Sequence, residues 1–340
     1  MTNPYLNKAG DVPPAIRIGR RAEAERVLFS VCPPPNGRPQ CVAIQGGRWI
    51  GKTTLLKAVH EQCKTRSAAT VAIHMPLHGY ACKAPQSFFL DLLNGLRESG
   101  QEVRKEWIEN PNTNALKKVC EAINAAGRTF ILMLDDFEVV ASNPNFSLEL
   151  FGFLRWLPEK YRIAYVTATR RPLWEPFIER EDIRGSPFPN IFQNPLSLAP
   201  FTAEDFRDMI SVSAKVAGVS LNEEEGHLQR LAGRFPLFLQ IACHLMFDLK
   251  VNGHPLGEKD LKLFHVQYQE IMNPYLETIW AMDFTDEDRR ACASVLDKKR
   301  VPEESLSRLQ TLEYAECEGE RPQLVPQVFR DFVVKKLSRD

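Results

Sequence analysis

The sequence has few of the patterns that define metal sites or disulfide frameworks. Eight cysteines are scattered through 340 residues, and no two of them form a CxxC pair. This scatter gives no zinc-site spacing and favours reduced thiols over a disulfide framework. Three residues separate His74 from His78, but no further metal ligand can be identified beside them. We therefore interpret all seven histidines as core or surface residues. The cysteines are Cys32, Cys41, Cys63, Cys82, Cys120, Cys243, Cys292 and Cys317.

Net charge and long apolar runs are also missing. Basic and acidic residues number 43 each, so the overall charge favours neither nucleic acid nor a membrane surface as a partner. No apolar run reaches about 18 residues, and the first residues, "MTNPYLNKAGDVPP", contain no apolar core of a signal peptide. We therefore expect a cytoplasmic protein without a membrane span. The length predicts two or three domains, and 44% hydrophobic residues suffice for sizeable cores.

One stretch, "CVAIQGGRWIGKTTLLKAVHEQC", changes character twice. It begins as a short buried strand (Cys41–Gln45), continues as a glycine-punctuated loop and ends with helical spacing. Gly46, Gly51, Lys52 and Thr53 match the pattern G-x-x-x-x-G-K-[ST]. The pattern predicts a phosphate-binding loop between a strand and a helix.

The chemistry of this pattern explains its residue types. A phosphate chain needs inward-pointing backbone N–H groups, and glycine lets the backbone approach closely. The N-terminus of the following helix adds its dipole, Lys52 adds a charge for the outer phosphates, and the Thr53 hydroxyl supplies a ligand for Mg²⁺. The predicted cofactors are ATP or ADP with Mg²⁺. We assign the following residues to the phosphates: Gly46, Gly47, Arg48, Trp49, Ile50, Gly51, Lys52, Thr53 and Thr54.

A second stretch, "RTFILMLDDFEVV", supplies the expected metal-binding carboxylate. Thr129–Leu134 is an apolar run typical of a central parallel strand that is covered on both faces. It places Asp135 and Asp136 at the strand's carboxyl end, where open α/β sheets bind ligands. We expect Asp135 to hold Mg²⁺, and Asp136 or Glu138 to orient or deprotonate the attacking water.

The next strand, in "RIAYVTATRRPLWE", ends at two arginines. A cation at this position can contact the γ-phosphate, and we favour Arg170 over Arg171 for this role. The alternative is that both arginines lie in a solvated turn. Two further strands are expected in "ATVAIHMPL" and "NIFQNPLSLAPF".

The pattern becomes helical from Phe201 onward. Thr202 is a candidate helix cap, and Pro236 stands at the start of the helix "PLFLQIACHLMFDLKVNG". The last block, Asp283–Lys336, predicts two helices, two short strands and a helix, which is the outline of a winged helix. The helix that would enter DNA, near Pro302–Leu312, carries mixed charges, and so we favour packing on the NTPase over DNA binding.

In their joint order these stretches resemble the STAND family, the signal-transduction branch of AAA+-type P-loop NTPases. "IRIGRRAEAERVL" is similar to the family's adenine-proximal segment, and "GGRWIGKTTLL", "LMLDDFEVV", "YVTATRRPL" and "LAPFTAEDFRDMI" follow in the family's order. "GRFPLFLQIACHLM" looks like the family's G-x-P helix. The resemblance implies that Gly19 and Arg20 lie near the adenine and that Pro236 lies against the base.

Three departures from the family pattern affect the predicted activity. Asp136 stands where many members carry Glu, which implies slow hydrolysis. The Met-His-Asp motif with which some members hold ADP is not visible in Asp283–Asp340. The sequence stops after the winged helix, so we expect the sensing or effector part in another polypeptide or in a segment that this sequence does not contain.

We therefore predict an α/β protein: a P-loop NTPase domain with a parallel sheet (residues 1–200), a helical lid (201–274) and a C-terminal winged helix (275–340). Its predicted function is that of an ATP-binding, slowly hydrolysing molecular switch that acts on a protein partner or effector, with homo-oligomers as a possible outcome. The alternatives are a DNA-associated AAA+-like ATPase of the replication-initiator or transposition-regulator type, and a nucleotide-bound scaffold without turnover.

Overall fold

A computed structural model describes residues 2–5, 19–34, 37–66, 69–251, 257–319 and 321–338. Ile16, Arg17 and Ile18 of the adenine-proximal resemblance lie outside these residues. The chain divides into two compact units. The first comprises residues 1–20, 47–51 and 199–340, and the second comprises 21–46 and 52–198. We call them the helical unit and the sheet unit.

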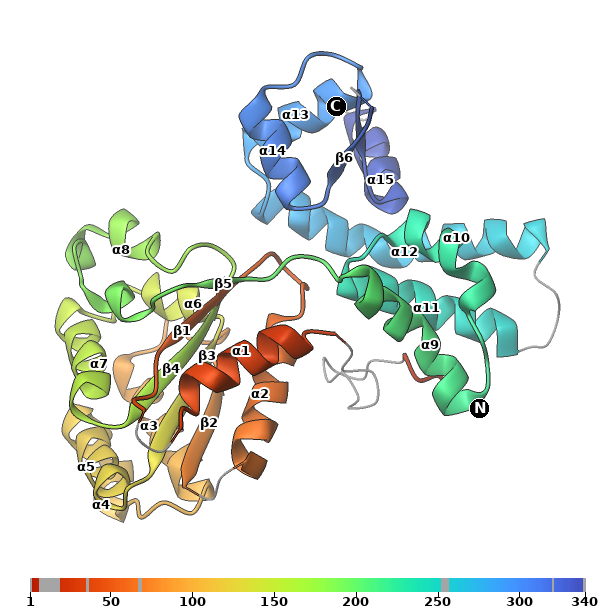
Figure 1. Cartoon of the computed structure of the whole chain (residues 1–340). Helices are drawn as coiled ribbons and strands as arrows, with labels where there is room; N and C mark the ends of the chain where they lie inside the picture. The colour runs from red at the N-terminus through yellow and green to blue at the C-terminus, as the bar shows by residue number, and fades with distance from the viewer. Residues whose placement is uncertain are drawn as a thin grey trace. The chain divides into compact units, whose positions relative to one another are not determined.

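The sheet unit contains five parallel strands in the order β2-β3-β4-β1-β5 (Figure 1). All five strands predicted from apolar runs are present. Because helices follow parallel strands and cover both faces, the inner strands β1, β3 and β4 are buried almost throughout. Their bounds are β1 Val42–Gln45, β2 Thr70–Pro76, β3 Thr129–Asp135, β4 Ile163–Thr169 and β5 Leu196–Ser197.

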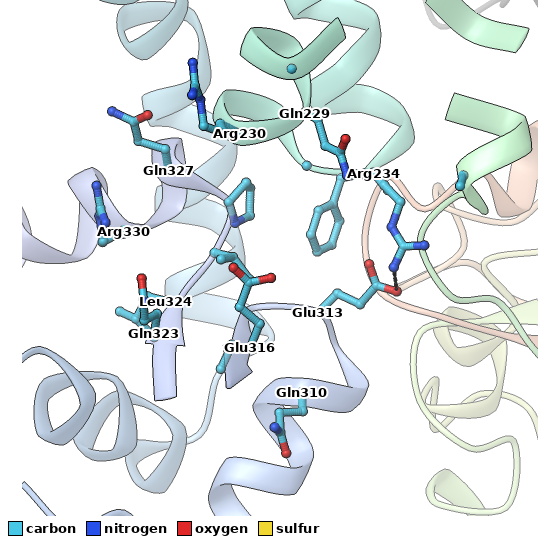
Figure 2. A pocket seen from close by; sticks show the side chains of 17 residues that line it. Gln229, Arg230, Arg234, Gln310, Glu313, Glu316, Gln323, Leu324, Gln327 and Arg330 are labelled. Carbon is cyan, nitrogen blue, oxygen red and sulfur yellow. Dashed lines mark hydrogen bonds and ion pairs between the residues drawn. The ribbon is translucent and has the colours of Figure 1, made fainter. Parts of the chain in front are cut away.

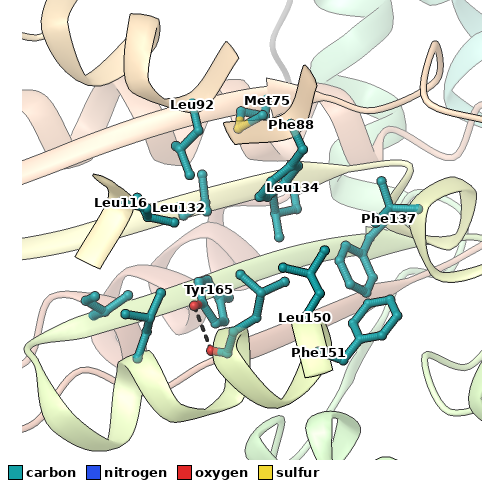
Figure 3. Close-up of a cluster of buried hydrophobic side chains, with 14 of the residues drawn as sticks. Met75, Phe88, Leu92, Leu116, Leu132, Leu134, Phe137, Leu150, Phe151 and Tyr165 are labelled. Carbon is teal, nitrogen blue, oxygen red and sulfur yellow. Dashed lines mark hydrogen bonds between the residues drawn. The ribbon is translucent and has the colours of Figure 1, made fainter. Parts of the chain in front are cut away.

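Helices follow the strands and pack on the two faces of the sheet. Alternate strand residues such as Leu132, Leu134 and Tyr165 point into one core, together with side chains of α3, α5 and α7 (Figure 3). The Tyr165 hydroxyl, buried in this core, donates to the Leu154 carbonyl at 2.8 Å. The helices of this unit are α1 Arg21–Val31, α2 Lys52–Arg66, α3 Pro85–Glu98, α4 Lys105–Glu109, α5 Thr113–Ala125, α6 Phe137–Ala141, α7 Leu148–Lys160 and α8 Pro176–Glu179, with 3₁₀ turns η2 Glu181–Ile183 and η3 Phe188–Ile191.

The first helix in the C-terminal part of the helical unit starts at the predicted cap. The Thr202 hydroxyl accepts from the Asp205 N–H, and the Asp205 carboxylate accepts from the Thr202 N–H, both at 3.1 Å, which is a capping box. Pro236 occupies the first turn of its helix, where its missing N–H costs no hydrogen bond. The elements are α9 Ala203–Ala217, η4 Asn222–Glu224, α10 Glu225–Ala232, α11 Pro236–Val251 and α12 Glu258–Met282. No helix of the described chain is long and apolar enough to span a membrane.

The C-terminal block follows the predicted order of two helices, two strands and a helix. Its elements are α13 Asp286–Leu296, α14 Glu303–Thr311, β6 Ala315–Glu318, β7 Arg321–Leu324 and α15 Gln327–Leu337, and the two strands pair antiparallel. Its assignment as a winged helix stays a prediction. Helix α12 continues through Pro274 to Met282, so the predicted boundary after residue 274 lies inside a helix.

Candidate nucleotide-binding site

The glycine loop joins β1 to α2, as its motif predicts. Gly46 donates its N–H to the Thr169 carbonyl at 3.1 Å, which fixes the start of the loop beside the end of β4. Gly51 has a φ of +99°, in the region that favours glycine. Within the described residues, no atom lies within 4 Å of a Cβ atom added at Gly47 or Gly51. No described side chain therefore crowds the loop at these two glycines.

Lys52 is the first residue of α2, and it points back over the loop. Its side chain is buried to 7% exposure, and its Nζ donates to the Gly46 carbonyl at 2.8 Å. The ammonium group is therefore held beside the loop, where an anion would replace or share this contact. Thr53 and Thr54 follow in the same helical turn, where unpaired backbone N–H groups and the positive helix end favour an anion.

Asp135 ends β3 and is almost completely buried, with 3% exposure. Burial acts to raise the pKa of its carboxyl, but His74, the Thr53 hydroxyl and the Lys52 charge together lower it. Among the residues that the structure describes, its Oδ1 atom meets no hydrogen-bond donor. A buried, charged carboxylate with a vacant oxygen, next to a threonine hydroxyl, is a donor set that suits a hard cation such as Mg²⁺.

Asp136 directly follows and adopts the left-handed conformation, with φ +55°. Burial and the negative charges of Asp135 and Glu138 raise the pKa of this carboxyl. A carboxyl with a raised pKa accepts a proton more readily than an ordinary aspartate. The two adjacent acids therefore have opposite tendencies, one to stay ionised and the other to take up a proton.

Arg170 and Glu138, both predicted as catalytic, form an ion pair in which Arg170 Nε lies 2.6 Å from Glu138 Oε1. Arg170 follows β4 and Glu138 lies in α6, so the pair joins the ends of two adjacent strands. Arg171 instead reaches Glu175 at 3.9 Å, with a side chain that is 65% exposed. The role of Arg170 at the γ-phosphate stays a prediction.

The remaining predicted contacts belong to the helical unit. Arg20 donates to the Ile50 carbonyl at 3.1 Å and to the Ala199 carbonyl, and its guanidinium lies over the Phe201 ring. At Gly19, with φ +75°, a Cβ would lie 2.9 Å from the Asp205 side chain, so no larger residue fits there without movement. Arg20 is thus in direct contact with Ile50 of the glycine loop.

Two residues of the glycine loop contact side chains of the helical unit, and these contacts were not predicted from the sequence. Arg48 Nε lies 3.1 Å from Asp283 Oδ1, and the ring of Trp49 meets Tyr275 edge-on at 5.1 Å. His74 was also missed as a site residue, and its Nε2 lies 3.7 Å from Asp135 Oδ2. A polar residue inside an otherwise apolar strand was the available signal for His74.

Pro236 begins α11 next to a cavity of about 940 Å³ within the helical unit. The preceding residues Gly233, Arg234 and Phe235 line it from one side, and residues of α14, β6, β7 and α15 line it from the other (Figure 2). Arg234 Nη2 lies 2.8 Å from Glu313 Oε1 across this space. The segment before Pro236 therefore faces the C-terminal block.

The parallel sheet, the glycine loop with Lys52 after β1 and the carboxylate at the end of β3, one strand further along the sheet beyond β4, define a P-loop ATPase of the AAA+ type. Solved structures share this fold. The Walker-type ATPase PABY2304 of Pyrococcus abyssi is 12% identical over 95% of this chain and 99% of its own, with a TM-score of 0.64. The Aeropyrum pernix ORC2 protein, in its ADPNP-ADP complexes, is 14% identical over 97% of this chain and 98% of its own, with a TM-score of 0.59.

Two family models match the sequence. The model described as Novel STAND NTPase 2 matches residues 110–299, more than half of the chain, and an AAA ATPase domain model matches residues 18–165. The chain belongs to the Novel STAND NTPase 2 family, which confirms the resemblance. It is also 24% identical over 135 residues to the ORC1-type DNA replication protein 10 of Halobacterium salinarum, which covers 38% of this chain and 32% of that protein.

Proposed function

We propose that the protein is an ATP-binding, slowly hydrolysing molecular switch in which exchange of ADP for ATP rearranges the domains and controls assembly or a partner. One observation carries this proposal: the predicted nucleotide contacts belong to both compact units. Lys52, Thr53 and Asp135 are in the sheet unit, whereas Arg20 and Pro236 are in the helical unit. A nucleotide that contacts both sets joins the units, because a ligand stabilises the form to which it binds.

In this proposal the chain's own residues bind and orient the nucleotide. The loop N–H groups and Lys52 hold the phosphates, Thr53 and Asp135 hold Mg²⁺, and Gly19, Arg20 and Pro236 contact the adenosine. Mg²⁺ held by Thr53 and Asp135 would supply positive charge beside the phosphates. The division into an NTPase domain (1–200), a lid (201–274) and a winged helix (275–340) is part of the proposal.

Slow hydrolysis follows from the acidic residues. Glu138 is paired with Arg170 at 2.6 Å, so neither is available for water or γ-phosphate while the pair persists. Asp136, with its raised pKa, is then the base, and its side chain is one methylene shorter than the Glu found in many relatives. Breaking the Arg170–Glu138 pair is the step that we expect to limit turnover.

The test compares the apo, ADP-bound and ATP·Mg²⁺-bound protein by thermal melting and small-angle scattering. We expect ADP to raise the Tm and to compact the protein, and ATP to give a more open or higher-order species. Pro236→Glu should blunt the ADP response, whereas Pro302→Glu, at an exposed position before α14, should preserve it. Identical profiles in all three states would overturn the switch and leave a nucleotide-binding scaffold.

The similarity to a protein named as a DNA replication protein favours a second candidate, a DNA-associated ATPase. The charges of α14 argue against it. Glu303 and Glu304 are exposed, and Arg308 Nε is engaged by Asp288 Oδ1 at 3.0 Å. A shift of the protein's mobility by duplex DNA at physiological salt would favour this candidate over the switch.

A further inference from the structure

Two cysteines of the sheet unit lie next to each other. Cys32 follows the last residue of α1, and Cys63 lies in α2, the helix that begins at Lys52. Their Sγ atoms are 3.7 Å apart, and both thiols are free. Among the residues that the structure describes, no other two cysteine sulfurs are in hydrogen-bond contact. The pair is therefore a local feature of the α1–α2 packing.

The two thiols differ in access to solvent. Cys63 is completely buried, with 0% exposure, whereas Cys32 is only half-buried. A small oxidant or alkylating reagent can thus reach Cys32 and not Cys63. This difference fixes the order in which the two sulfurs can react.

The two thiols also differ in acidity. The hydrogen bond from Cys63 lowers the pKa of Cys32 to about 7 despite partial burial, and the positive charge of Arg66 and a hydrogen bond with Thr70 contribute. The same hydrogen bond and burial raise the pKa of Cys63 well above its ordinary value. At neutral pH a substantial fraction of the reachable sulfur is thus thiolate, and the buried sulfur keeps its proton.

We propose that Cys32 and Cys63 form a hydroperoxide-reactive dithiol in which Cys32 is oxidised first and Cys63 then closes a disulfide between α1 and α2. This modification site is separate from the nucleotide contacts and does not depend on the proposed switch. Its location nevertheless ties it to the site, because α2 carries Lys52 and Thr53 at its other end.

The chemistry balances with one hydroperoxide per disulfide. The Cys32 thiolate attacks the peroxide, its O–O bond breaks, and with one proton the products are Cys32 sulfenic acid and water or an alcohol. The Cys63 sulfur then attacks the sulfenic sulfur, an S–S bond forms, and the hydroxyl leaves as water with the Cys63 proton. Two sulfurs are oxidised and the peroxide oxygens are reduced. A small-molecule dithiol reverses the reaction by exchange.

The required movement is small. A disulfide bond is about 2.05 Å long, so the sulfurs must approach by roughly 1.6 Å, a distance that side-chain rotation covers. The link would connect the end of α1 to the last turn of α2. Because it closes a loop that is open in the reduced chain, it should raise the Tm of the sheet unit.

The experiment treats the full chain with hydrogen peroxide, blocks the remaining thiols with N-ethylmaleimide and maps the non-reduced peptides by mass spectrometry. We expect a linked Cys32–Cys63 peptide that dithiothreitol removes, with the exposed Cys82 and Cys317 still alkylated. The proposal is overturned if Cys32 is recovered alkylated while Cys82 or Cys317 is oxidised. It is also overturned if Cys32 reaches the sulfinic acid while Cys63 stays a thiol.

Variants separate the two roles. Cys63→Ala should trap Cys32 as a sulfenic acid that reacts with dimedone, and Cys32→Ser should leave Cys63 unmodified. Cys82→Ser is the matched control and should still form the disulfide. If a variant fails to fold, Arg66→Gln offers a second measurement on an exposed residue. It should move the pH profile of Cys32 alkylation to higher pH, and an unchanged profile would count against the proposed activation.

Discussion

Single residues at the glycine loop are held by contacts that a bound nucleotide would change. Lys52 is buried and donates to the Gly46 carbonyl, and one carboxylate oxygen of Asp135 has no partner within the described part of the chain. An unpartnered buried carboxylate oxygen costs stability unless a ligand or ion takes it up. The residues of this site are therefore arranged for ligands more than for stability.

Lys52→Ala tests the phosphate role at the residue scale. We expect nucleotide affinity to fall at least tenfold, which corresponds to about 1.4 kcal/mol or more, because the charge for the outer phosphates is lost. Isothermal titration calorimetry measures the change. Lys64→Ala, on the exposed part of the same helix, is the control. Equal affinities for both variants would contradict the phosphate assignment.

Arg180 is a second single residue with a large expected effect. Its Nη1 donates to the carbonyls of Ala141 and Asn143, both at 2.8 Å, and its Nη2 donates to the Phe146 carbonyl at 3.1 Å. It thus secures the chain that leaves α6. Lysine cannot reproduce this fork of donors, so Arg180→Lys should lower the free energy of unfolding by about 1–3 kcal/mol.

Denaturant titration checks this value. Arg184→Lys is the matched control, because Arg184 is exposed and, among the described residues, its side chain makes one hydrogen bond, to the Ile178 carbonyl. We expect Arg184→Lys to lower the free energy of unfolding by less than a third of the loss caused by Arg180→Lys. If Arg184→Lys lowered the free energy of unfolding as much as Arg180→Lys, the three hydrogen bonds from Arg180 to backbone carbonyls would not explain the effect.

At the scale of elements, α10 and α12 meet through a pair of histidines. His227 Nε2 and His265 Nε2 lie 3.1 Å apart, so one ring must donate and the other must accept. Burial lowers the pKa of both rings, and for His227 the charges of His265 and Arg230 act in the same direction. The negative charge of Glu224 acts to raise the pKa of His227, and that of Asp331 acts to raise the pKa of His265. In both rings the net shift is still downward.

This pair should make the stability of the helical unit depend on pH. A depressed histidine pKa stabilises the fold above the ordinary value of 6.5, and the contribution is lost as the pH falls through the lowered pKa. We expect the Tm to drop below about pH 6. His227→Gln should flatten this dependence, because glutamine keeps a hydrogen-bonding group but does not titrate there.

Melting curves at several pH values give the comparison. His78→Gln, at an exposed position in the sheet unit, should retain the slope of the parent protein. An unchanged slope in His227→Gln would remove the histidine pair as the cause.

The strands and helices were predictable because their signals are local. The apolar run of β3 and the capping box of α9 lie within a few consecutive residues, and the fold class was predicted from them. His74 beside Asp135 and the Arg170–Glu138 pair were not predictable. They depend on β3 lying between β2 and β4, an order that consecutive residues do not encode. For the same reason, Arg48 and Trp49 could be assigned to the glycine loop from the sequence, but their contacts with Asp283 and Tyr275 could not be predicted.

At the scale of the whole molecule, the chain forms two compact units, each with its own buried core. Units of this size can unfold as separate cooperative steps. We expect two transitions in calorimetry without nucleotide. Arg180→Lys should lower only the transition of the sheet unit. Thr202→Ala, which removes the cap of α9 at a cost of about 1 kcal/mol, should lower only the other transition.

A single transition that both variants shift equally would contradict this division. With ADP the two transitions should move closer together, because the proposed ligand contacts both units. Calorimetry of the two variants with and without ADP therefore measures the coupling between the units directly.

Trp49 gives the molecule a built-in optical probe. It is one of five tryptophans, and it lies inside the glycine loop with its ring against Tyr275. Indole emission responds to the polarity and packing around the ring, so a triphosphate entering the loop should change its colour and intensity. With Phe in place of Trp107, Trp156, Trp174 and Trp280, the remaining fluorescence would follow the filling and emptying of the loop in real time, without any attached dye.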